Sequence, residues 1–364
     1  MSDDRDIELD DWDPQEPDGE NGIADAAADD DGTAFEDEVD AKVLALRSLY
    51  VASGRDAVLA RSFERLLKER DSPNPIRRWA GLLLMAPSGA GKTRMMRRFL
   101  AAHPRVHDFA GDDSNFIGID VPSPVTNKSL GLAVLRSMYP QQRKVPPTGP
   151  KATIDSASRL SDIWDEARKI SADLDILGLW IDEAHDLANG GPNTMTILRA
   201  SLKRWMAHEH RPLVILSGTP ELAALFETRE FRRRFLVVES PDLTADADTA
   251  HLRRMIARYA REVGLGIDSS LQDFMPRLIH AGTRQIGWTL DLVLEAIRVA
   301  LLESADRLAI EHFADAYSDI SGCDADNNPF TADDWSGIDT VLHRDRDFVE
   351  PKRPRRRRRK DTPW

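Results

Sequence analysis

The sequence predicts an α/β protein in which a parallel sheet is flanked by helices and followed by a small helical domain. Short apolar runs alternate with helical segments as far as residue 240, and helical patterns alone follow Pro241. Strands that alternate with helices are typical of a parallel sheet. The expected strands are Gly81–Met85, Asn115–Val121, Leu177–Ile181, Leu213–Leu216 and Leu236–Glu239.

The helical spacing of apolar residues predicts the remaining elements. A helical stretch over Val43–Glu69, broken by a turn near Gly54, comes before the first strand. One expected helix follows the segment APSGAGKT and ends at about Ala102. The others are expected over Ser129–Met138, His251–Val263, Leu271–Ile279, Gln285–Glu303 and Ile310–Tyr317. We therefore divide the chain into an acidic disordered tail (1–40), an α/β domain (41–240), a helical domain (241–320), and a linker with a basic disordered tail (321–364).

The composition fits a globular protein with a sizeable core. The chain has 364 residues, of which 41% are hydrophobic, which suits one large domain or two modest ones. No apolar run approaches the ~18 residues that a membrane span needs, and the acidic N-terminus lacks the pattern of a secretory signal. A single cysteine, Cys323, excludes an internal disulfide framework and a cysteine-rich metal site. We expect a cytoplasmic protein with no membrane partner.

Charge is distributed very unevenly along the chain. Residues 1–40 contain 18 Asp and Glu against Arg5, whereas eight of the nine residues 352–360 are Lys or Arg. The acidic head has too few large apolar residues to offset the entropy of ordering, so we expect it to be disordered. It either serves solvation or competes with nucleic acid for basic surfaces. The tail matches the phosphates of duplex DNA, unless it is simply solvated or is neutralised by the head.

A phosphate-binding loop is predicted after the first strand, where Ala86–Thr93 reads APSGAGKT and a helical segment follows. The backbone N–H groups of such a loop and the start of the helix form a seat for phosphates. The seat would be built by Pro87, Ser88, Gly89, Ala90, Gly91, Lys92 and Thr93. Lys92 would reach the β- and γ-phosphates, and Thr93 would complete a Mg²⁺ shell.

Ala86 departs from the usual pattern, which has a glycine at this position. An alanine is tolerated there if its φ is negative. The alternative interpretation of the whole segment is an ordinary glycine-containing loop between a core strand and a core helix.

Two carboxylates, Asp182 and Glu183, close the apolar run of the segment LGLWIDEAHDL. The carboxyl end of a strand in a parallel sheet faces the crevice where a phosphate loop also lies. Asp182 would hold Mg²⁺ through its water shell, and Glu183 would orient and activate the attacking water. The alternative is a strand that simply ends in polar residues at the surface. The tetrad DEAH also occurs in RNA helicases, but those need a second ATPase domain, which nothing after residue 240 supplies.

Hydroxyl groups follow a later strand, in the segment LVILSGTPEL. Ser217 or Thr219 could donate a hydrogen bond to the γ-phosphate or to the attacking water. The alternative is a plain Ser-Gly-Thr-Pro turn.

Arginines occur at two further places that could reach a nucleotide. Arg232, Arg233 and Arg234 come just before the last strand, and an arginine supplied to a neighbouring subunit's nucleotide stabilises transition-state charge. Three consecutive arginines cannot all serve one site, so some of them face solvent. Arg284 stands near the start of a helix in the helical domain, where it would either reach the phosphates or simply lie on the surface.

In this order, the motifs resemble those of the AAA+ ATPases, and within them the TniB/TnsC-type transposition ATPases. The resemblance covers residues 43–320. It rests on the segments MAPSGAGKTRMMRRFLAAHP, IDVPSP, LWIDEAHDLANG, SGTPELAALFETREFRRRF and AGTRQIGWTLDLVLEAI. The first and third are specific for AAA+ proteins, whereas IDVPSP, SGTPEL and the IG of the last segment favour the transposition branch.

The resemblance implies a P-loop AAA+ fold with a helical lid, binding of ATP and Mg²⁺, and ATP hydrolysis. It implies Walker A roles for Lys92 and Thr93, Walker B roles for Asp182 and Glu183, a sensor role for Thr219 with Ser217 as second choice, an arginine-finger role for Arg234, and a lid-sensor role for Arg284. Family members form ATP-dependent oligomers on DNA and pass target information to a DDE-type transposase.

Two hypotheses follow. The first is an AAA+ ATPase that assembles as a homo-oligomer on duplex DNA and regulates transposase targeting or strand transfer, with Arg234 acting between subunits. The alternative is a nucleotide-gated adaptor, in secretion or signalling, that has no DNA role.

Overall fold

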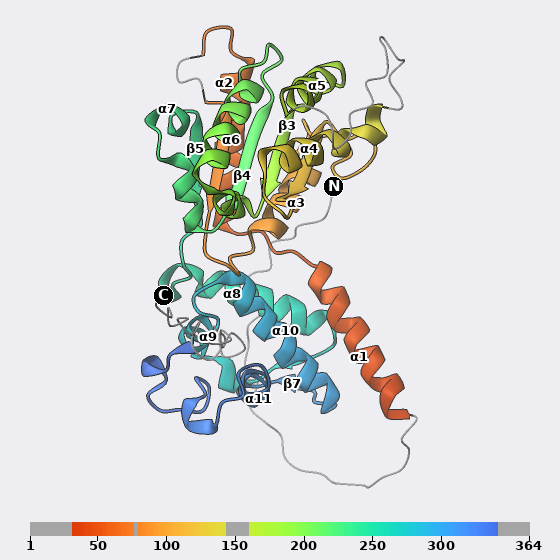
Figure 1. The fold of residues 1–364 in the computed structure, drawn as a ribbon. Coiled ribbons are helices and arrows are strands. Elements are labelled where there is room, and N and C mark those ends of the chain that lie inside the picture. Colours follow the sequence, from red (N-terminus) through yellow and green to blue (C-terminus); the bar gives the residue numbers. More distant parts are fainter. Residues whose placement is uncertain (1–30, 76–78, 143–159, 341–364) are drawn as a thin grey trace, which may run out of the picture. The chain divides into compact units, whose positions relative to one another are not determined.

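The computed structural model describes residues 31–75, 79–142 and 160–340. The described chain divides into two compact units (Figure 1). The α/β unit consists of Tyr50–Asp242 together with Gln285–Gly287, and the helical unit contains the other described residues. Residues 1–30 of the acidic head, residues 76–78 and 143–159, and the basic tail lie outside the described ranges.

The α/β unit is built around a five-stranded parallel sheet with the order β2-β3-β4-β1-β5. Its strands are β1 (Gly81–Met85), β2 (Phe116–Asp120), β3 (Gly178–Asp182), β4 (Leu213–Gly218) and β5 (Phe235–Glu239). All five lie at the positions that the apolar runs predict, and the α/β fold with a parallel sheet is confirmed.

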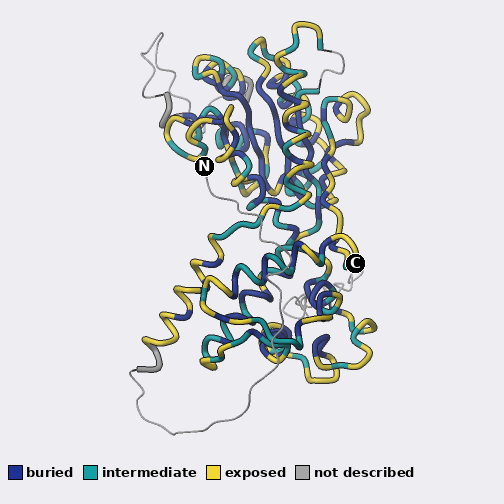
Figure 2. Tube along the Cα trace, turned by 180° about the vertical axis from the view of Figure 1, so that it is seen from behind, coloured by how far each residue is buried: buried dark blue, intermediate teal, exposed yellow. Residues whose placement is uncertain are grey.

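Helices cover both faces of the sheet. They are α2 (Gly54–Asp71), α3 (Lys92–Ala102), α4 (Asn127–Gln142), α5 (Leu160–Asp173), α6 (Gly191–Met206) and the short α7 (Arg229–Arg232). Helices α2 and α3 pack their apolar residues on one face, and α4, α5 and α6 pack on the other. The three central strands β1, β3 and β4 are buried almost throughout, in dark blue in Figure 2, which explains why they read as continuous apolar runs.

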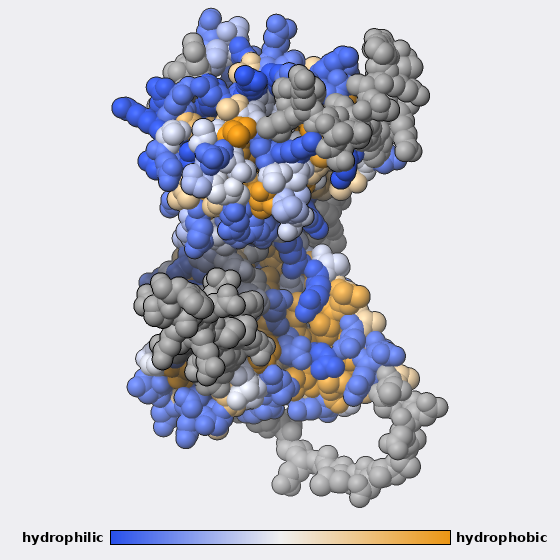
Figure 3. Space-filling model, in the orientation of Figure 1, coloured by the Kyte–Doolittle hydropathy of each residue, from blue (hydrophilic) through white to orange (hydrophobic). Residues whose placement is uncertain are grey.

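Two 3-10 helices, η2 (Ala184–Gly190) and η3 (Pro220–Phe226), follow directly after β3 and β4. The two pack against each other beyond the carboxyl ends of their strands. In the view of Figure 3, hydrophilic side chains cover most of the surface of the α/β unit. This is expected for a unit whose large apolar residues are buried against the sheet.

The helical unit contains α1 (Asp31–Ser48), α8 (Ala245–Glu262), α9 (Met275–Ala281), α10 (Ile286–Leu302) and α11 (Ile310–Ser321), with the first two residues of α10 assigned to the α/β unit. Residues 322–340 contain two 3-10 turns and pack back on α11, where the ring of Phe330 lies 5.7 Å from that of Phe313. Within the described ranges, we find no helix that is long and apolar enough to cross a bilayer.

The helical unit differs from the sequence expectations at three places. The acidic head was expected to be disordered through residue 40, but α1 begins at Asp31, because Val39, Val43 and Leu46 share one buried face. The helix expected over Leu271–Ile279 starts later, at Met275, where a proline occupies the first turn. A small parallel pair, β6 (Gly266–Ile267) and β7 (Arg307–Leu308), was not expected at all.

Candidate nucleotide-binding site

The phosphate loop connects the end of β1 to the start of α3. Gly89 and Gly91 have φ angles of 75° and 73°, in the left-handed region that glycine adopts without strain. The Ala86 N–H donates to Gly218 O of β4 at 3.2 Å, and Ala86 has no positive φ. An alanine therefore fits where the usual motif has glycine, as the sequence analysis expected.

Lys92 is buried inside the curve of this loop, with 5% of its surface exposed. Its ammonium donates to Ala86 O at 2.9 Å and to Pro87 O at 3.0 Å. Burial lowers the pKa of Lys92, while the negative charges of Glu183, Asp182 and Glu221, in that order, act to raise it. The loop thus holds a cation at its centre with carboxylates nearby.

Thr93 joins the phosphate loop to the carboxyl end of β3. Its hydroxyl donates to Asp182 Oδ2 at 2.5 Å, although 89 residues separate the two in the chain. Asp182 is 2% exposed, and its other oxygen accepts from the Ser217 hydroxyl at 2.6 Å and from the Glu183 N–H at 3.0 Å. Ser217 in turn accepts from the Trp180 Nε1–H at 2.7 Å.

A hydroxyl and a carboxylate side by side next to a buried lysine suit Mg²⁺, which is held by few protein oxygens and otherwise by phosphates and water. Among the residues that the structure describes, there is no group of three or more His, Cys, Asp or Glu side chains that would enclose a metal by itself. The residues present therefore fit a nucleotide-bound Mg²⁺, with Thr93 and Asp182 as the protein contribution.

Glu183 follows in a constrained backbone conformation. Its φ of 46° lies in the left-handed region, which is uncommon for a residue with a side chain and is often found at functional sites. The carboxylate is 48% exposed, and of the negative charges near Lys92 it has the largest effect on that lysine. It is accessible to a water molecule next to the phosphate loop.

The two candidate hydroxyls of β4 take different positions. Ser217 is fully buried, and its hydroxyl donates its hydrogen bond to Asp182. It therefore supports that carboxylate. Thr219 caps η3 just beyond the strand. Its hydroxyl is buried, makes no regular hydrogen bond within the described residues, and lowers the pKa of the nearby Glu221. Thr219 thus places a hydroxyl next to Glu221, one of the acids that act on Lys92.

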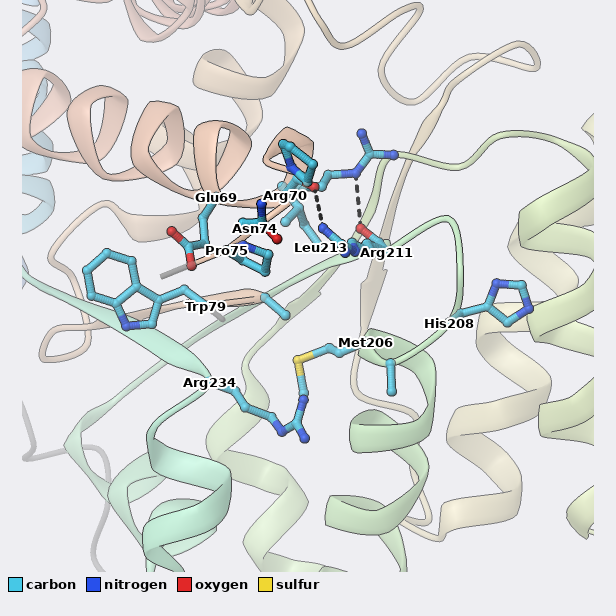
Figure 4. A pocket seen from close by; sticks show the side chains of 13 residues that line it. Glu69, Arg70, Asn74, Pro75, Trp79, Met206, His208, Arg211, Leu213 and Arg234 are labelled. Carbon is cyan, nitrogen blue, oxygen red and sulfur yellow. Dashed lines mark hydrogen bonds between the residues drawn. The ribbon is translucent and has the colours of Figure 1, made fainter. Parts of the chain in front are cut away.

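Arg234 lies at the amino end of the sheet, opposite the carboxyl end at which the phosphate loop begins. Its carbonyl accepts from the N–H groups of Ala80 and Gly81 at the start of β1, so the length of that strand, roughly 16 Å, separates it from the phosphate loop. Its side chain lines a cavity of about 600 Å³ (Figure 4), in which the guanidinium points toward Met206. The cavity wall is braced by reciprocal hydrogen bonds, from Arg70 Nε to Arg211 O at 3.0 Å and from Arg211 Nη1 to Arg70 O at 3.1 Å. Arg234 therefore cannot serve the phosphate loop of its own chain.

Its two neighbours in the arginine cluster are less constrained. Arg232 and Arg233 are exposed, whereas Arg234 is half-buried. Of the three, Arg234 is the one whose position the fold controls.

Arg284 belongs to the helical unit, and the phosphate loop belongs to the α/β unit. Its φ is 60°, its N–H donates to Ile279 O at 2.8 Å, and its Nε donates to Leu243 O at 3.4 Å. The role proposed for it as a phosphate contact stays a prediction.

Sequence reasoning missed the residues that follow Arg284. Gln285–Gly287 belong to the α/β unit, and the Gly287 N–H donates to Gly89 O of the phosphate loop at 2.7 Å. A Cβ on Gly287 would lie 2.4 Å from that oxygen, so only glycine fits. The pair Ile286-Gly287 is part of the resemblance to TniB/TnsC-type proteins. Nothing in the sequence around it indicates a contact with a loop almost 200 residues earlier.

Comparison with known proteins gives one family match and several likenesses among solved structures. Residues 80–226 match a protein-family model described as "AAA domain". A search of curated sequences gives no match. Among solved structures, Cdc6p of Pyrobaculum aerophilum matches with 15% identity and a TM-score of 0.50, over 77% of this chain and 70% of that one. The Orc1 protein of Aeropyrum pernix in complex with DNA matches with 20% identity and a TM-score of 0.49, over 76% and 67%.

At 15% identity, the likeness to Cdc6p shows the fold alone. The structure thus has the P-loop AAA+ fold, with a parallel five-stranded sheet flanked by helices and a helical C-terminal part. The expected fold class is confirmed, and the narrower resemblance to TniB/TnsC-type proteins stays a prediction.

The hydrogen bonds around Asp182 give a stability prediction. Replacing Ser217 by Ala leaves the Trp180 N–H without its acceptor and removes one of the two donors to Asp182 Oδ1. Unsatisfied buried groups cost about 1–3 kcal/mol each, so we expect Ser217→Ala to lower the free energy of unfolding by that amount in urea titrations. The control is Ser137→Ala, because the Ser137 hydroxyl donates within its own helix to Val134 O. Equal stability of the two variants would contradict the supporting role of Ser217.

Proposed function

We propose that this protein binds Mg²⁺–ATP at the phosphate loop and hydrolyses it to ADP and phosphate. The observation that carries the proposal is the 2.5 Å hydrogen bond from Thr93 to Asp182, which brings the start of α3 and the end of β3 together next to the buried Lys92. A structural loop has no need of a buried lysine, a threonine hydroxyl and a buried carboxylate at a single point.

Each residue has a distinct role in this proposal. The backbone of Pro87–Gly91 and the N-terminus of α3 hold the phosphates, and Lys92 exchanges its two loop carbonyls for phosphate oxygens. When bound, Mg²⁺ would neutralise charge that develops on the phosphates. Thr93 and Asp182 hold the ion, Glu183 takes a proton from the attacking water, and Thr219 donates to the γ-phosphate or to that water.

The position of Arg234 supports assembly into a homo-oligomer. The arginine lies at the opposite edge of the sheet from its own phosphate loop, so in this proposal its guanidinium completes the site of a neighbouring copy. An arginine that approaches the transferred phosphoryl group stabilises its charge in the transition state. The proposal also gives Arg284 of the helical unit a role as a phosphate contact.

We further propose that the oligomer assembles on duplex DNA in the cytoplasm and regulates a DDE-type transposase. Support for the DNA partner comes from the charge of residues 352–360, of which eight are Lys or Arg. Support for the transposase comes from the sequence segments that resemble TniB/TnsC-type proteins.

The ATPase proposal predicts two separable defects. We expect Lys92→Ala to weaken ATP binding about 10- to 100-fold, because the ammonium donates charged hydrogen bonds to the phosphates. Glu183→Gln should bind ATP normally and lose hydrolysis by about 100-fold or more, because the amide accepts no proton. Fluorescent-nucleotide titration and phosphate release measure the two effects. Wild-type protein without ATP turnover would disprove the proposal.

Action of Arg234 between subunits predicts complementation. Alone, Arg234→Ala should lose about 1,000-fold in turnover, and Lys92→Ala should be inactive. A mixture of the two regains activity, because Lys92→Ala subunits supply Arg234 to the intact phosphate loops of the other variant. Arg229→Ala, in the same exposed segment, is the control and should keep wild-type turnover. A mixture that stays inactive would contradict this arrangement.

The DNA proposal predicts binding that weakens steeply with salt. With ATP present, the logarithm of the association constant for duplex DNA should fall with the logarithm of salt concentration, with a slope of up to roughly −7. Replacing the Lys and Arg of residues 352–360 by Ser should bring the slope close to zero at unchanged length. Fluorescence anisotropy with labelled DNA measures both. A protein indifferent to duplex DNA in every nucleotide state would favour the adaptor hypothesis instead.

A further inference from the structure

His185 stands two residues after the candidate catalytic base and has no role in the mechanism described so far. It belongs to η2, whose N-cap is Glu183. Its Nδ1 atom lies 3.2 Å from Glu183 Oε2, and its Nε2 atom lies 3.8 Å from Asp186 Oδ1. Nδ1 is buried and makes no regular hydrogen bond within the described residues, so the Glu183 carboxylate is its nearest charged neighbour.

The imidazole packs directly against the end of β4. A Cβ on Gly218 would lie 3.0 Å from the His185 backbone nitrogen, 3.2 Å from its Nδ1 and 3.4 Å from its Cβ. Gly218 has no positive φ, so its backbone would accept alanine. The absence of a side chain at Gly218 is therefore needed for the space that His185 occupies. Gly218 is followed immediately by Thr219.

The groups that surround the imidazole are mainly acidic. Glu183 and Asp186 lie on its own segment, and Glu221 of η3 also interacts with it electrostatically. Lys92 is the cation that faces the same carboxylates from the phosphate loop, and Glu183 is the acid with the largest effect on it. The Glu183 carboxylate thus contacts His185 and also interacts electrostatically with the lysine of the phosphate loop.

Resting on the proposed ATPase function, we infer that His185 is a positioning residue for Glu183. It keeps the carboxylate turned toward the phosphate loop and, through its contact with Gly218, links that orientation to the strand end that carries Thr219. An exposed ion pair would contribute little, because solvent competes with it and side-chain entropy opposes it. Here the contact atom of His185 is buried and the imidazole packs against β4, so solvent competes less for this contact than for an exposed pair.

The first test separates turnover from binding. We expect His185→Ala to lower kcat about 10- to 100-fold, the range that a misplaced catalytic group causes, with KM for ATP unchanged within about 2-fold. His185→Gln, which keeps a polar N–H donor of similar reach, should recover part of the loss. His107→Ala removes an exposed histidine of the same unit and should behave as wild type. Equal kcat for His185→Ala and wild type would overturn the inference, and so would a higher kcat, which would mean that His185 restrains Glu183.

A double-mutant cycle tests whether His185 acts through Glu183. If it does, adding His185→Ala to Glu183→Gln causes no further loss of the residual turnover, whereas two independent losses would multiply and disprove the link. Gly218→Ala tests the same contact with His185 still present, and should lower kcat at unchanged KM. Full activity of Gly218→Ala would contradict the link to β4.

Thermal unfolding of each variant shows whether it is folded. The outcomes also distinguish this inference from the proposed function. Wild-type protein without ATP turnover would remove both, whereas active wild type with a fully active His185→Ala would remove this inference alone.

Discussion

The arrangement of the site depends on one buried carboxylate. Asp182 accepts hydrogen bonds from Thr93 at the start of α3, from Ser217 inside β4 and from the backbone of Glu183, so three segments that are far apart in the chain meet at its two oxygens. A buried carboxylate is costly unless such donors surround it. The same donors make the site specific in shape, because moving any one segment leaves Asp182 or its partner unsatisfied. Both the ion-holding pair and the direction of the chain into Glu183 follow from this constraint.

The parallel sheet adds a second constraint, which is one of distance. All five strands point the same way. Every residue that directly follows a strand therefore lies at the carboxyl end of the sheet, and every residue that directly precedes a strand lies at the amino end. The phosphate loop, Glu183 and Thr219 follow β1, β3 and β4, whereas Arg234 precedes β5. In the proposed oligomer, a second copy would bring Arg234 to the phosphate loop from which its own chain separates it.

The sequence was sufficient for whatever depends on local pattern. The continuous apolar run at Gly81–Met85 predicts β1 to the residue, and the glycine spacing of the phosphate loop predicts its place before α3. It was insufficient where contacts join distant segments. Ser217 and Thr219 both place a hydroxyl at the end of one strand, but only the structure shows that Ser217 donates to Asp182 and that Thr219 lies near Glu221 instead. The sequence did not predict the start of α1, because the few apolar residues of its buried face stand among many acidic ones. The strands β6 and β7 have two residues each and are too short for any periodic signal.

The hydrogen bond from Gly287 to Gly89 has a mechanical consequence. The first two residues of α10 belong to the α/β unit, and the rest of this 17-residue helix belongs to the helical unit. A rotation of the Gly89 peptide must therefore either break the bond to Gly287 or move the start of α10 with it. A larger residue at Gly287 would push directly on the Gly89 carbonyl, so the phosphate loop and the start of this helix can only vary together.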